Sequence, residues 1–400
     1  MVTQELEINE VACSDESQLA ALRAANYSVN SSVPQCRDAS LMIANCIALG
    51  YCERIRLFEI SASGQTLGWL IGVQEVALSE LRLGPLVLHR YRQPRLRFLG
   101  DYSFVPSAGW FDEAALSNVI VRLSRKMRGE AIYIQAVDCG SAMSRVVARL
   151  REMRTARVCT EYTERARHRL IPEGSFDSYL QSLTKSTRQT FRYSLKRLRD
   201  HCGGDVRLEV YETPEAIEDF ANAAAKVAEK TYQQRRLGLG FTNSERVKAR
   251  LRLAADFGWA RGLILRCRGE AVAYIEGYQA GGTFVAYQIG FLPEWSKWSA
   301  GTVCQLEAIK YLMDVASVRP QAIDYLEGDS DFKRRMCNVS STETSVWVFT
   351  RTNRTAAYFY AQVGLDAVSR AIRPAAKSLV ALYSRFRTRF GSSRKAVDSA

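Results

Sequence analysis

Residues 283–312 read TFVAYQIGFLPEWSKWSAGTVCQLEAIKYL and decide how the second half of the chain folds. The first nine are rich in β-branched and aromatic side chains, which predicts a strand over 283–291. Val303, Leu306 and Ile309 recur at the spacing of one helix face, which predicts a helix over about 301–316. A strand, a short loop and a helix in this order are typical of α/β sheets.

The loop before this helix combines Ser299, Gly301 and Thr302, with Lys297 just ahead of them. Ser299 is predicted to cap the helix, and Gly301 to let the backbone turn tightly where the helix begins. The first N–H groups of a helix and its dipole attract an anion, and Lys297 would add a positive charge. Two interpretations stay open, a phosphate site and an ordinary capped helix.

The flanking segments predict the same alternation of strands and helices. The residues before 165 predict strands at 54–62, 65–74, 96–100 and 131–137, and helices at 15–25, 36–48, 112–128 and 141–153. The later residues predict strands at 206–212, 262–268, 271–278, 322–327 and 345–350, and helices at 176–200, 214–230 and 243–256. Such alternation favours a partly parallel sheet. Residues 182–199 contain six basic and no acidic residues, which modestly favours an anion-facing helix over a solvated one.

Composition limits the classes of protein that fit. A chain of 400 residues with 47% hydrophobic residues suits two domains, and its net charge of +13 predicts an anionic ligand or partner. The ten cysteines are scattered and the three histidines lie apart, so we expect no metal site. The polar, acidic start of the chain and the scattered thiols predict a reducing cytoplasm, and no segment suits a membrane span.

Three stretches carry a resemblance to a known family: SLTKSTRQTFR (182–192), SKWSAGT (296–302) and IDYLEGDSDFKRR (323–335). Together they resemble the GNAT-superfamily acyltransferases of the CelD/BioF2-like group, which is distantly similar to the FemAB-type peptidoglycan bridge enzymes. The resemblance is strongest over about 175–350. It implies an α/β (α+β) fold of tandem GNAT-like domains, each a mixed, partly parallel central sheet flanked by helices.

The resemblance implies that the chain divides into two domains and a tail. These are a degenerate GNAT-like domain at 1–170, the acyltransferase domain at 171–365 and a basic helical tail at 366–400. It also implies that strands 283–291 and 322–327 splay to admit the pantetheine arm of coenzyme A. Its diphosphate would then lie on the following helix, at Lys297, Ser299, Gly301 and Thr302. The chain departs from the usual glycine-rich GNAT loop, because only Gly301 stands there.

The activity that the resemblance implies is an acyl-CoA-dependent (acetyl-CoA) N- or O-acyltransferase. Its acceptor would be a sugar, a polysaccharide precursor or a small amine. Two alternatives are an aminoacyl-tRNA-dependent transferase of FemAB type and a non-catalytic component of a polysaccharide-synthesis complex. We do not expect a nucleic-acid partner in the leading interpretation. The tail after Pro374 is basic and amphipathic, so it predicts either a packed helix or peripheral contact with an anionic inner membrane face.

Carboxylates are the candidate bases, because acyl transfer to an amine needs a proton acceptor and the histidines look poorly placed. Along strand 322–327, alternation places Asp324 and Glu327 on opposite faces, with Glu327 at the carboxyl end. Glu327 is the preferred base and Asp329 remains open, while Lys333 either orients substrate or pairs with Asp324. The alternative is an ion-pair network that holds the turn.

A second acid lies in the middle of strand 271–278. Glu276 shares a face with Tyr274 and Tyr278, so it is either a catalytic residue in a substrate cleft or a solvent-facing residue. Tyr287 and Gln288 on the next strand are candidate hydrogen-bond donors to a substrate. Simple packing is the alternative for both.

Overall fold

The computed structural model describes most of the chain between residues 54 and 349 and a short segment at each side. The described residues are 6–11, 54–83, 86–106, 112–127, 130–153, 155–160, 164–231, 240–280, 282–349, 356–368 and 371. The helices predicted at 15–25 and 36–48 lie outside these residues, as does the basic tail beyond 371.

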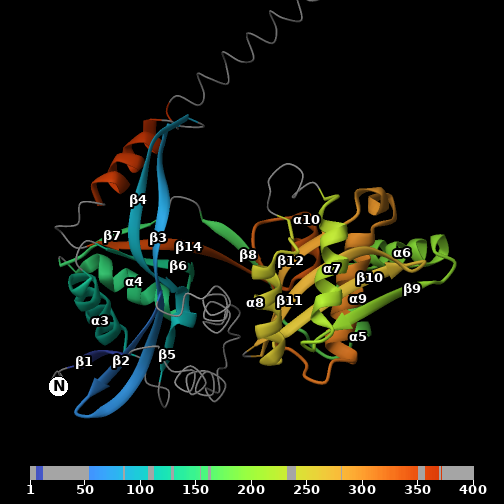
Figure 1. Ribbon diagram of the computed structural model, residues 1–400, viewed down its shortest axis with the longest axis horizontal. Helices are drawn as coiled ribbons and strands as arrows, with labels where there is room; N and C mark the ends of the chain where they lie inside the picture. The colour runs from blue at the N-terminus through green and yellow to red at the C-terminus, as the bar shows by residue number, and fades with distance from the viewer. Residues whose placement is uncertain are drawn as a thin grey trace, which may run out of the picture.

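Strands alternate with helices along the described residues (Figure 1). The strands are β1 Leu6–Val11, β2 Ile55–Ala62, β3 Gln65–Leu83, β4 Leu86–Leu99, β5 Phe104–Pro106, β6 Ala131–Asp138, β7 Arg157–Thr160, β8 Arg165–Leu170, β9 Val206–Tyr211, β10 Ala260–Cys267, β11 Glu270–Ala280, β12 Thr283–Phe291, β13 Ala322–Glu327 and β14 Val339–Phe349. The helices are η2 Gly100–Ser103, α3 Glu113–Lys126, α4 Ala142–Glu152, α5 Phe176–Ser182, α6 Lys185–His201, α7 Ile217–Ala228, α8 Glu245–Asp256, η4 Pro293–Trp298, α9 Ala300–Asp314 and α10 Asp331–Met336.

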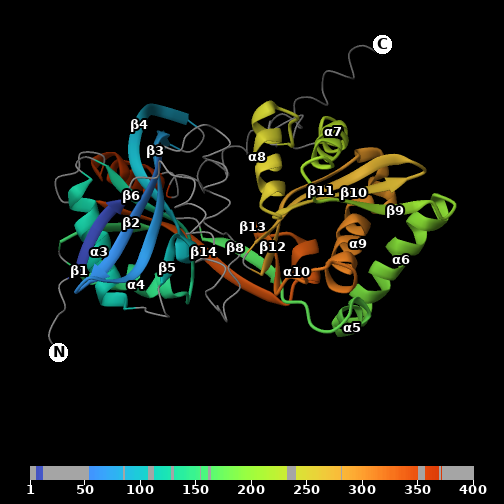
Figure 2. The same cartoon turned by 60° about the horizontal axis from the view of Figure 1, so that its bottom comes forward.

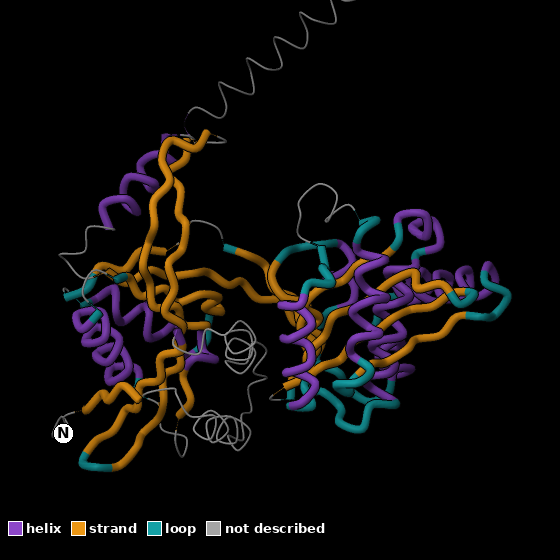
Figure 3. The backbone as a smooth tube through the Cα atoms, in the orientation of Figure 1, coloured by secondary structure: helices purple, strands orange, loops and turns teal. Residues whose placement is uncertain are grey.

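One continuous sheet runs through both halves of the described chain (Figure 3). Its order is β1-β2-β3-β4-β6-β14-β8-β13-β12-β11-β10-β9, with β5 against β3 and β7 against β14. The pairs β4–β6 and β12–β13 are parallel and the others are antiparallel. Strand β14 joins the halves, because residues 339–343 pair with β8 and residues 343–348 pair with β6. The predicted boundary at residue 170 falls at the end of β8, so the sheet continues across it.

Helices cover the sheet in both halves, which confirms the predicted fold class. In the second half α7 and α8 lie on one face, and α5, α6 and α9 lie on the other (Figure 2). Alternate residues of β10 and β11 supply the two cores, since Leu263 and Ile275 face α9 while Ile264 and Tyr274 face α7 and α8. In the first half α3 and α4 pack on one face of the sheet.

The hairpin of β3 and β4 is much longer than its sequence predicted. The predicted strands end at 74 and begin at 96, whereas the observed ones extend to Leu83 and from Leu86. Most of the added residues are exposed or partly exposed, and they lack a regular alternation of apolar and polar side chains. The hydrophobic pattern therefore did not predict them as strand. Cross-strand ion pairs support this extension, such as Glu80 with Arg90 at 2.9 Å.

The helix predicted at 176–200 is two helices. Leu183 is extended (ψ 155°), and the Thr184 hydroxyl caps α6 by accepting the N–H of Thr187 at 3.3 Å. The single-helix prediction was wrong because a side-chain cap at Thr184 competes with continuing the helix.

A helical segment at 356–368 packs on the β3–β4 hairpin, where the Tyr358 ring stacks on Tyr91 at 4.4 Å. Among the described helices, none is both long and apolar enough to cross a bilayer.

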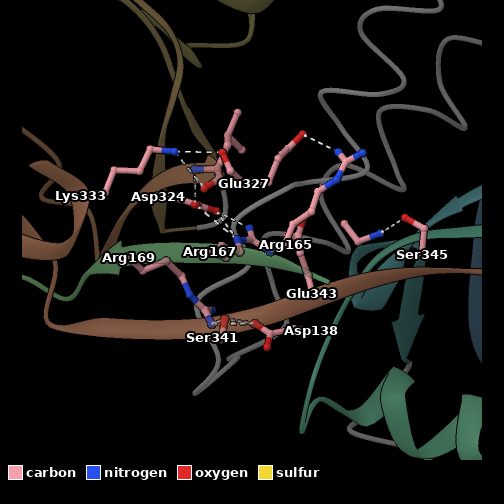
Figure 4. Close-up of polar contacts among 12 residues, drawn as sticks. Asp138, Arg165, Arg167, Arg169, Asp324, Glu327, Lys333, Ser341, Glu343 and Ser345 are labelled. Atoms are coloured by element: carbon pink, nitrogen blue, oxygen red, sulfur yellow. Dashed lines mark hydrogen bonds and ion pairs between the residues drawn. The ribbon is translucent and has the colours of Figure 1, made fainter. Parts of the chain in front are cut away.

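A buried arginine joins three strands at the junction of the halves (Figure 4). The Arg167 side chain on β8 is fully buried and donates to Asp324 on β13, with Nε 3.1 Å from Oδ2 and a second bond from Nη2. Its Nη1 donates to Glu343 on β14 at 3.3 Å. Two residues further on, Arg169 donates to Asp138 at the end of β6 at 2.7 Å. Strands from both halves are thus held by charge-assisted hydrogen bonds.

Replacing Arg167 with methionine is expected to lower the free energy of unfolding by about 3–5 kcal/mol, because it leaves two buried carboxylates without their counter-charge. Arg165→Met on the same strand is the control, since Arg165 is exposed and should change stability by less than about 1 kcal/mol. Urea unfolding followed by circular dichroism measures both. Equal effects of the two substitutions would contradict the central role given to Arg167.

Candidate active site

Strands β12 and β13 are paired only at their starts. Thr283, Phe284 and Val285 pair in parallel with residues 322–324, and over the remaining described residues the two strands make no further pairs. The separation begins next to an irregularity in β12. Glu276 on β11 faces Gln288 and Gly277 faces Ala286, so Tyr287 is an extra, bulged residue. A β-bulge bends its strand, and this one turns β12 away from β13.

The bend directs backbone groups of β12 into the gap. Leu292 N–H donates to Val272 O on β11 at 2.9 Å. Hydrogen-bonded and non-bonded pairs alternate along an antiparallel ladder, so Ile289 and Phe291 point their N–H and C=O groups away from β11. Those groups face the side from which β13 has separated. The gap is therefore lined by strand amides that can donate hydrogen bonds to a ligand.

Helix α9 begins at Ala300, close to its predicted start, and the short helix η4 separates it from the end of β12. Ser299 is the N-cap residue, as predicted, and its carbonyl accepts the N–H of Val303 at 2.9 Å. Its backbone is left-handed (φ 59°), however, and its side chain makes no capping bond with the described residues. Gly301 has no unusual φ. It lacks a side chain because a Cβ would lie 2.7 Å from the Phe291 ring. That ring is 38% exposed, and an anion on the first turn of α9 must lie beside it. Contacts of Lys297, Ser299, Gly301 and Thr302 with a diphosphate stay predictions.

A second bulge, in β13, changes the faces of the sheet on which Asp324 and Glu327 lie, so the predicted faces were wrong. Asp324 pairs with Arg169 and Glu327 with Arg167, so three residues of β13 span two of β8. Leu326 takes up the difference with a left-handed backbone (φ 58°), and its N–H donates to the Asp324 carboxylate at 2.8 Å. Asp324 and Glu327 therefore share one face. That face is the α7–α8 side, because their neighbour Ile323 belongs to the core under α9.

Asp324 and Lys333 do not form the predicted ion pair. Asp324 is buried against Arg167, which removes it from contact with a substrate. The Lys333 ammonium instead donates to the carbonyls of Leu326, Glu327 and Gly328, at 3.4, 2.9 and 3.2 Å. Burial lowers the pKa of Lys333, although the nearby carboxylates Glu327 and Asp324 oppose this effect. Lys333 thus holds the turn that presents Glu327 (Figure 4).

Asp329 is drawn to the opposite face of the sheet by His168. The buried His168 ring lies between Asp329 (Nε2 to Oδ1, 3.0 Å) and Ser340 (Nδ1 to Oγ, 2.9 Å). Partial desolvation raises the pKa of Asp329, but bonds from His168 and Arg334 outweigh it and hold that pKa below its ordinary value. The contact of His168 with Asp329 is not visible in the sequence, where the histidines look poorly placed, because residues 168 and 329 meet only through the pairing of β8 with β13.

Glu276 is buried, so its interpretation as a solvent-facing residue was wrong. Its carboxylate is fully buried and accepts hydrogen bonds from Arg250 on α8 and from the Tyr278 hydroxyl at 2.5 Å. The Arg250 guanidinium also lies 5.1 Å from the centre of the Tyr287 ring. Glu276 Oε2 and Gln288 Oε1, on neighbouring strands, are buried and have no hydrogen-bond partner within the part of the chain that the structure describes. Two acceptors without donors lie on the α7–α8 face, beside the bulge that opens the gap.

The site thus has carboxylates on both sides of the gap and on one face of the sheet. Glu327 stands on β13, 35% exposed and 3.6 Å from Arg165, while Glu276 stands on β11 with Gln288 beside it on β12. Among the described residues, no group of three or more His, Cys, Asp and Glu side chains is arranged to hold a metal ion.

Part of the chain also matches a known family. Residues 185–334 match the family model described as an acetyltransferase (GNAT) domain. This match confirms the resemblance that the sequence predicted. No curated protein matches the chain.

Two solved structures are similar in fold. The crystal structure of FemX is 11% identical, with a TM-score of 0.58, covering 88% of this chain and 100% of that one. A conserved protein of unknown function from Bacteroides thetaiotaomicron VPI-5482 is 15% identical, with a TM-score of 0.51, covering 82% of this chain and 97% of that one. At these identities the likeness shows a shared fold.

Replacing Glu276 with glutamine is expected to cost about 3 kcal/mol of unfolding free energy, because Arg250 then remains buried without its counter-charge. Glu327→Gln, which breaks only a partly exposed contact, should cost less than about 1 kcal/mol. Thermal and urea unfolding of both variants measure the difference. A Glu276→Gln protein as stable as wild type would show that Glu276 is held for a purpose other than stability.

Proposed function

We propose that this protein is an acyl-CoA-dependent acyltransferase, with acetyl-CoA as the simplest donor. Its acceptor is the amino or hydroxyl group of a sugar, a polysaccharide precursor or a small amine. The GNAT acetyltransferase domain at residues 185–334 supports an acyltransferase. The observation that carries the proposal is the gap between β12 and β13, which opens at the Tyr287 bulge. It is lined by strand amides that pair with no other strand among the described residues.

The donor fits this gap because a thioester arm is narrow, extended and rich in amides. Its amides can pair with the exposed edge of β12 as a short additional strand would. The thioester carbonyl then lies near the N–H groups of Ile289 and Phe291, which are fixed donors for the oxyanion of the tetrahedral intermediate. The diphosphate follows at the first turn of α9, where free helix N–H groups favour negative charge.

Of the three candidate carboxylates, Glu327 is the one that we propose as the general base. Glu327 lies at the carboxyl end of β13, partly exposed and on the α7–α8 face. Asp329 is turned to the opposite face and made less basic by His168 and Arg334. Glu276 is committed to Arg250, and its remaining oxygen is placed to hold an acceptor group rather than to exchange protons with water. The acceptor's amine or hydroxyl would attack the thioester carbon and form a new C–N or C–O bond while its proton passes to Glu327. The C–S bond then breaks, and the coenzyme A thiolate that leaves takes up that proton.

The aminoacyl-tRNA-dependent alternative keeps some support from the shared fold with FemX and from the exposed basic residues of α6. A non-catalytic role in a polysaccharide-synthesis complex would leave Glu327 without a function. We propose a cytoplasmic location, and peripheral attachment through the basic tail remains a second proposal, since that tail lies outside the described residues.

Acetyl-CoA at one hundred times its dissociation constant should stabilise the folded protein by about 2.7 kcal/mol. Thermal denaturation with acetyl-CoA, with coenzyme A and with deacylated tRNA measures this effect. Stabilisation by tRNA but by neither coenzyme would overturn the donor assignment in favour of the FemAB-like alternative.

Glu327→Gln should lower acyl transfer at least about 100-fold, the usual contribution of a positioned general base. Asp329→Asn is the matched control and should retain activity within about tenfold. Wild-type protein is first screened with amino sugars, sugar nucleotides and small amines, and coenzyme A released from acetyl-CoA is quantified by chromatography. Both variants must keep the acetyl-CoA thermal shift. A larger loss in Asp329→Asn would move the role of base to Asp329.

A further inference from the structure

Three basic side chains lie around Trp298, just before α9, and a fourth, Arg268, donates to the backbone of one of them. Arg197 and His201 come from the end of α6, Arg268 from the turn between β10 and β11, and Lys297 from η4. The Trp298 ring stacks on His201 with centroids 3.8 Å apart, and the Arg197 guanidinium and Lys297 ammonium lie 5.0 and 5.3 Å from its centre. We call these four side chains with Trp298 the basic cluster.

The basic cluster has no internal counter-charge. Among the described residues, none of its four basic groups forms an ion pair with a carboxylate, although Asp200 and Asp205 lie close in sequence. Arg268 donates to the His201 carbonyl instead. By contrast Arg199, also on α6, pairs with Glu307 at 3.1 Å. Like charges held together on three elements repel one another, so an external anion would stabilise this arrangement.

One of the four basic groups, His201, has a lowered pKa in this cluster. Partial desolvation and the charges of Arg268 and Lys297 lower its pKa below the ordinary value. His201 is therefore uncharged near neutral pH. Its ring stacks on Trp298, which keeps the indole fixed between η4 and α6.

The basic cluster lies next to the turn that would hold the donor's diphosphate. Trp298 precedes Ala300, the first residue of α9, by two positions, and α6 packs along both η4 and α9. Coenzyme A carries a third phosphate, on the ribose beyond its diphosphate. A diphosphate at the first turn of α9 thus brings this second anionic group within reach of unpaired cations on an adjacent surface.

We propose that the basic cluster binds the 3′-phosphate of coenzyme A, with Arg197, Arg268 and Lys297 as its ligands. The proposal rests on the proposed function, because it assumes that the donor's diphosphate lies on α9. It adds a specificity for the 3′-phosphorylated nucleotide, supplied by α6, the β10–β11 turn and η4. The Arg197 guanidinium already lies over the Trp298 ring, which fixes one of the phosphate's ligands before binding.

Isothermal titration of the full chain with coenzyme A and with 3′-dephospho-coenzyme A tests the proposal. Wild-type protein should bind coenzyme A at least about tenfold more tightly, since hydrogen bonds to a charged group are among the stronger ones. Arg197→Met and Arg268→Met should each weaken binding of coenzyme A several-fold and leave that of the dephospho form within twofold. Lys297→Met should weaken binding of both forms, because Lys297 is also a predicted contact of the diphosphate. Lys196→Met is the control, because it removes one exposed charge from the same helix outside the basic cluster.

The outcomes separate the two proposals. Equal affinity for the two coenzymes, or equal losses for both in Arg197→Met and Arg268→Met, would overturn the 3′-phosphate assignment and leave the donor site standing. Binding of neither coenzyme would overturn both. Binding of deacylated tRNA alone, weakened in Arg197→Met, would show that the basic cluster contacts RNA phosphate, and the assignment to coenzyme A would fall. Circular dichroism of each variant confirms that it is folded.

Discussion

Burial of the Arg167 guanidinium between two carboxylates is the constraint from which the site's geometry follows. A buried charge is tolerated only when opposite charges and hydrogen bonds surround it, so Asp324 and Glu343 must lie beside β8. That requirement sets β13 on one side of β8 and β14 on the other. Because β14 continues into the first half and pairs with β6, the same charge cluster ties the site to both halves.

Two bulges then convert a regular sheet into an open site. The bulge at Tyr287 bends β12 away from its neighbour, and the bulge at Leu326 turns Glu327 onto the face that carries α7 and α8. The second bulge depends on Asp324, whose carboxylate accepts the Leu326 N–H while it neutralises Arg167. Asp324, which neutralises the arginine that joins the halves, therefore also sets the direction of the candidate base Glu327.

Much of the fold could be predicted from the sequence, because most strands and helices carry a regular apolar period. The positions and types of α3, β6, α7 and β12 follow from that period. What failed was local geometry. Strict alternation placed Asp324 and Glu327 on opposite faces, since no pattern marks a non-glycine residue such as Leu326 for a left-handed backbone. The contacts His168–Asp329 and Arg250–Glu276 join residues 161 and 26 positions apart, and only the packed sheet brings them together.

The distribution of charge separates residues that hold the structure from those available to ligands. Acids predicted as functional were mostly found with internal partners, as Asp324 is with Arg167 and Glu276 is with Arg250. The cations of the basic cluster lack such partners among the described residues. They lie at the surface, where solvent and salt screen the repulsion between them. A protein with this excess of positive charge gains specificity only where the cations converge from several elements, because a single helix face offers no fixed geometry to an anion. The convergence of α6, η4 and the β10–β11 turn beside α9 meets that condition. The basic residues of α6 alone do not.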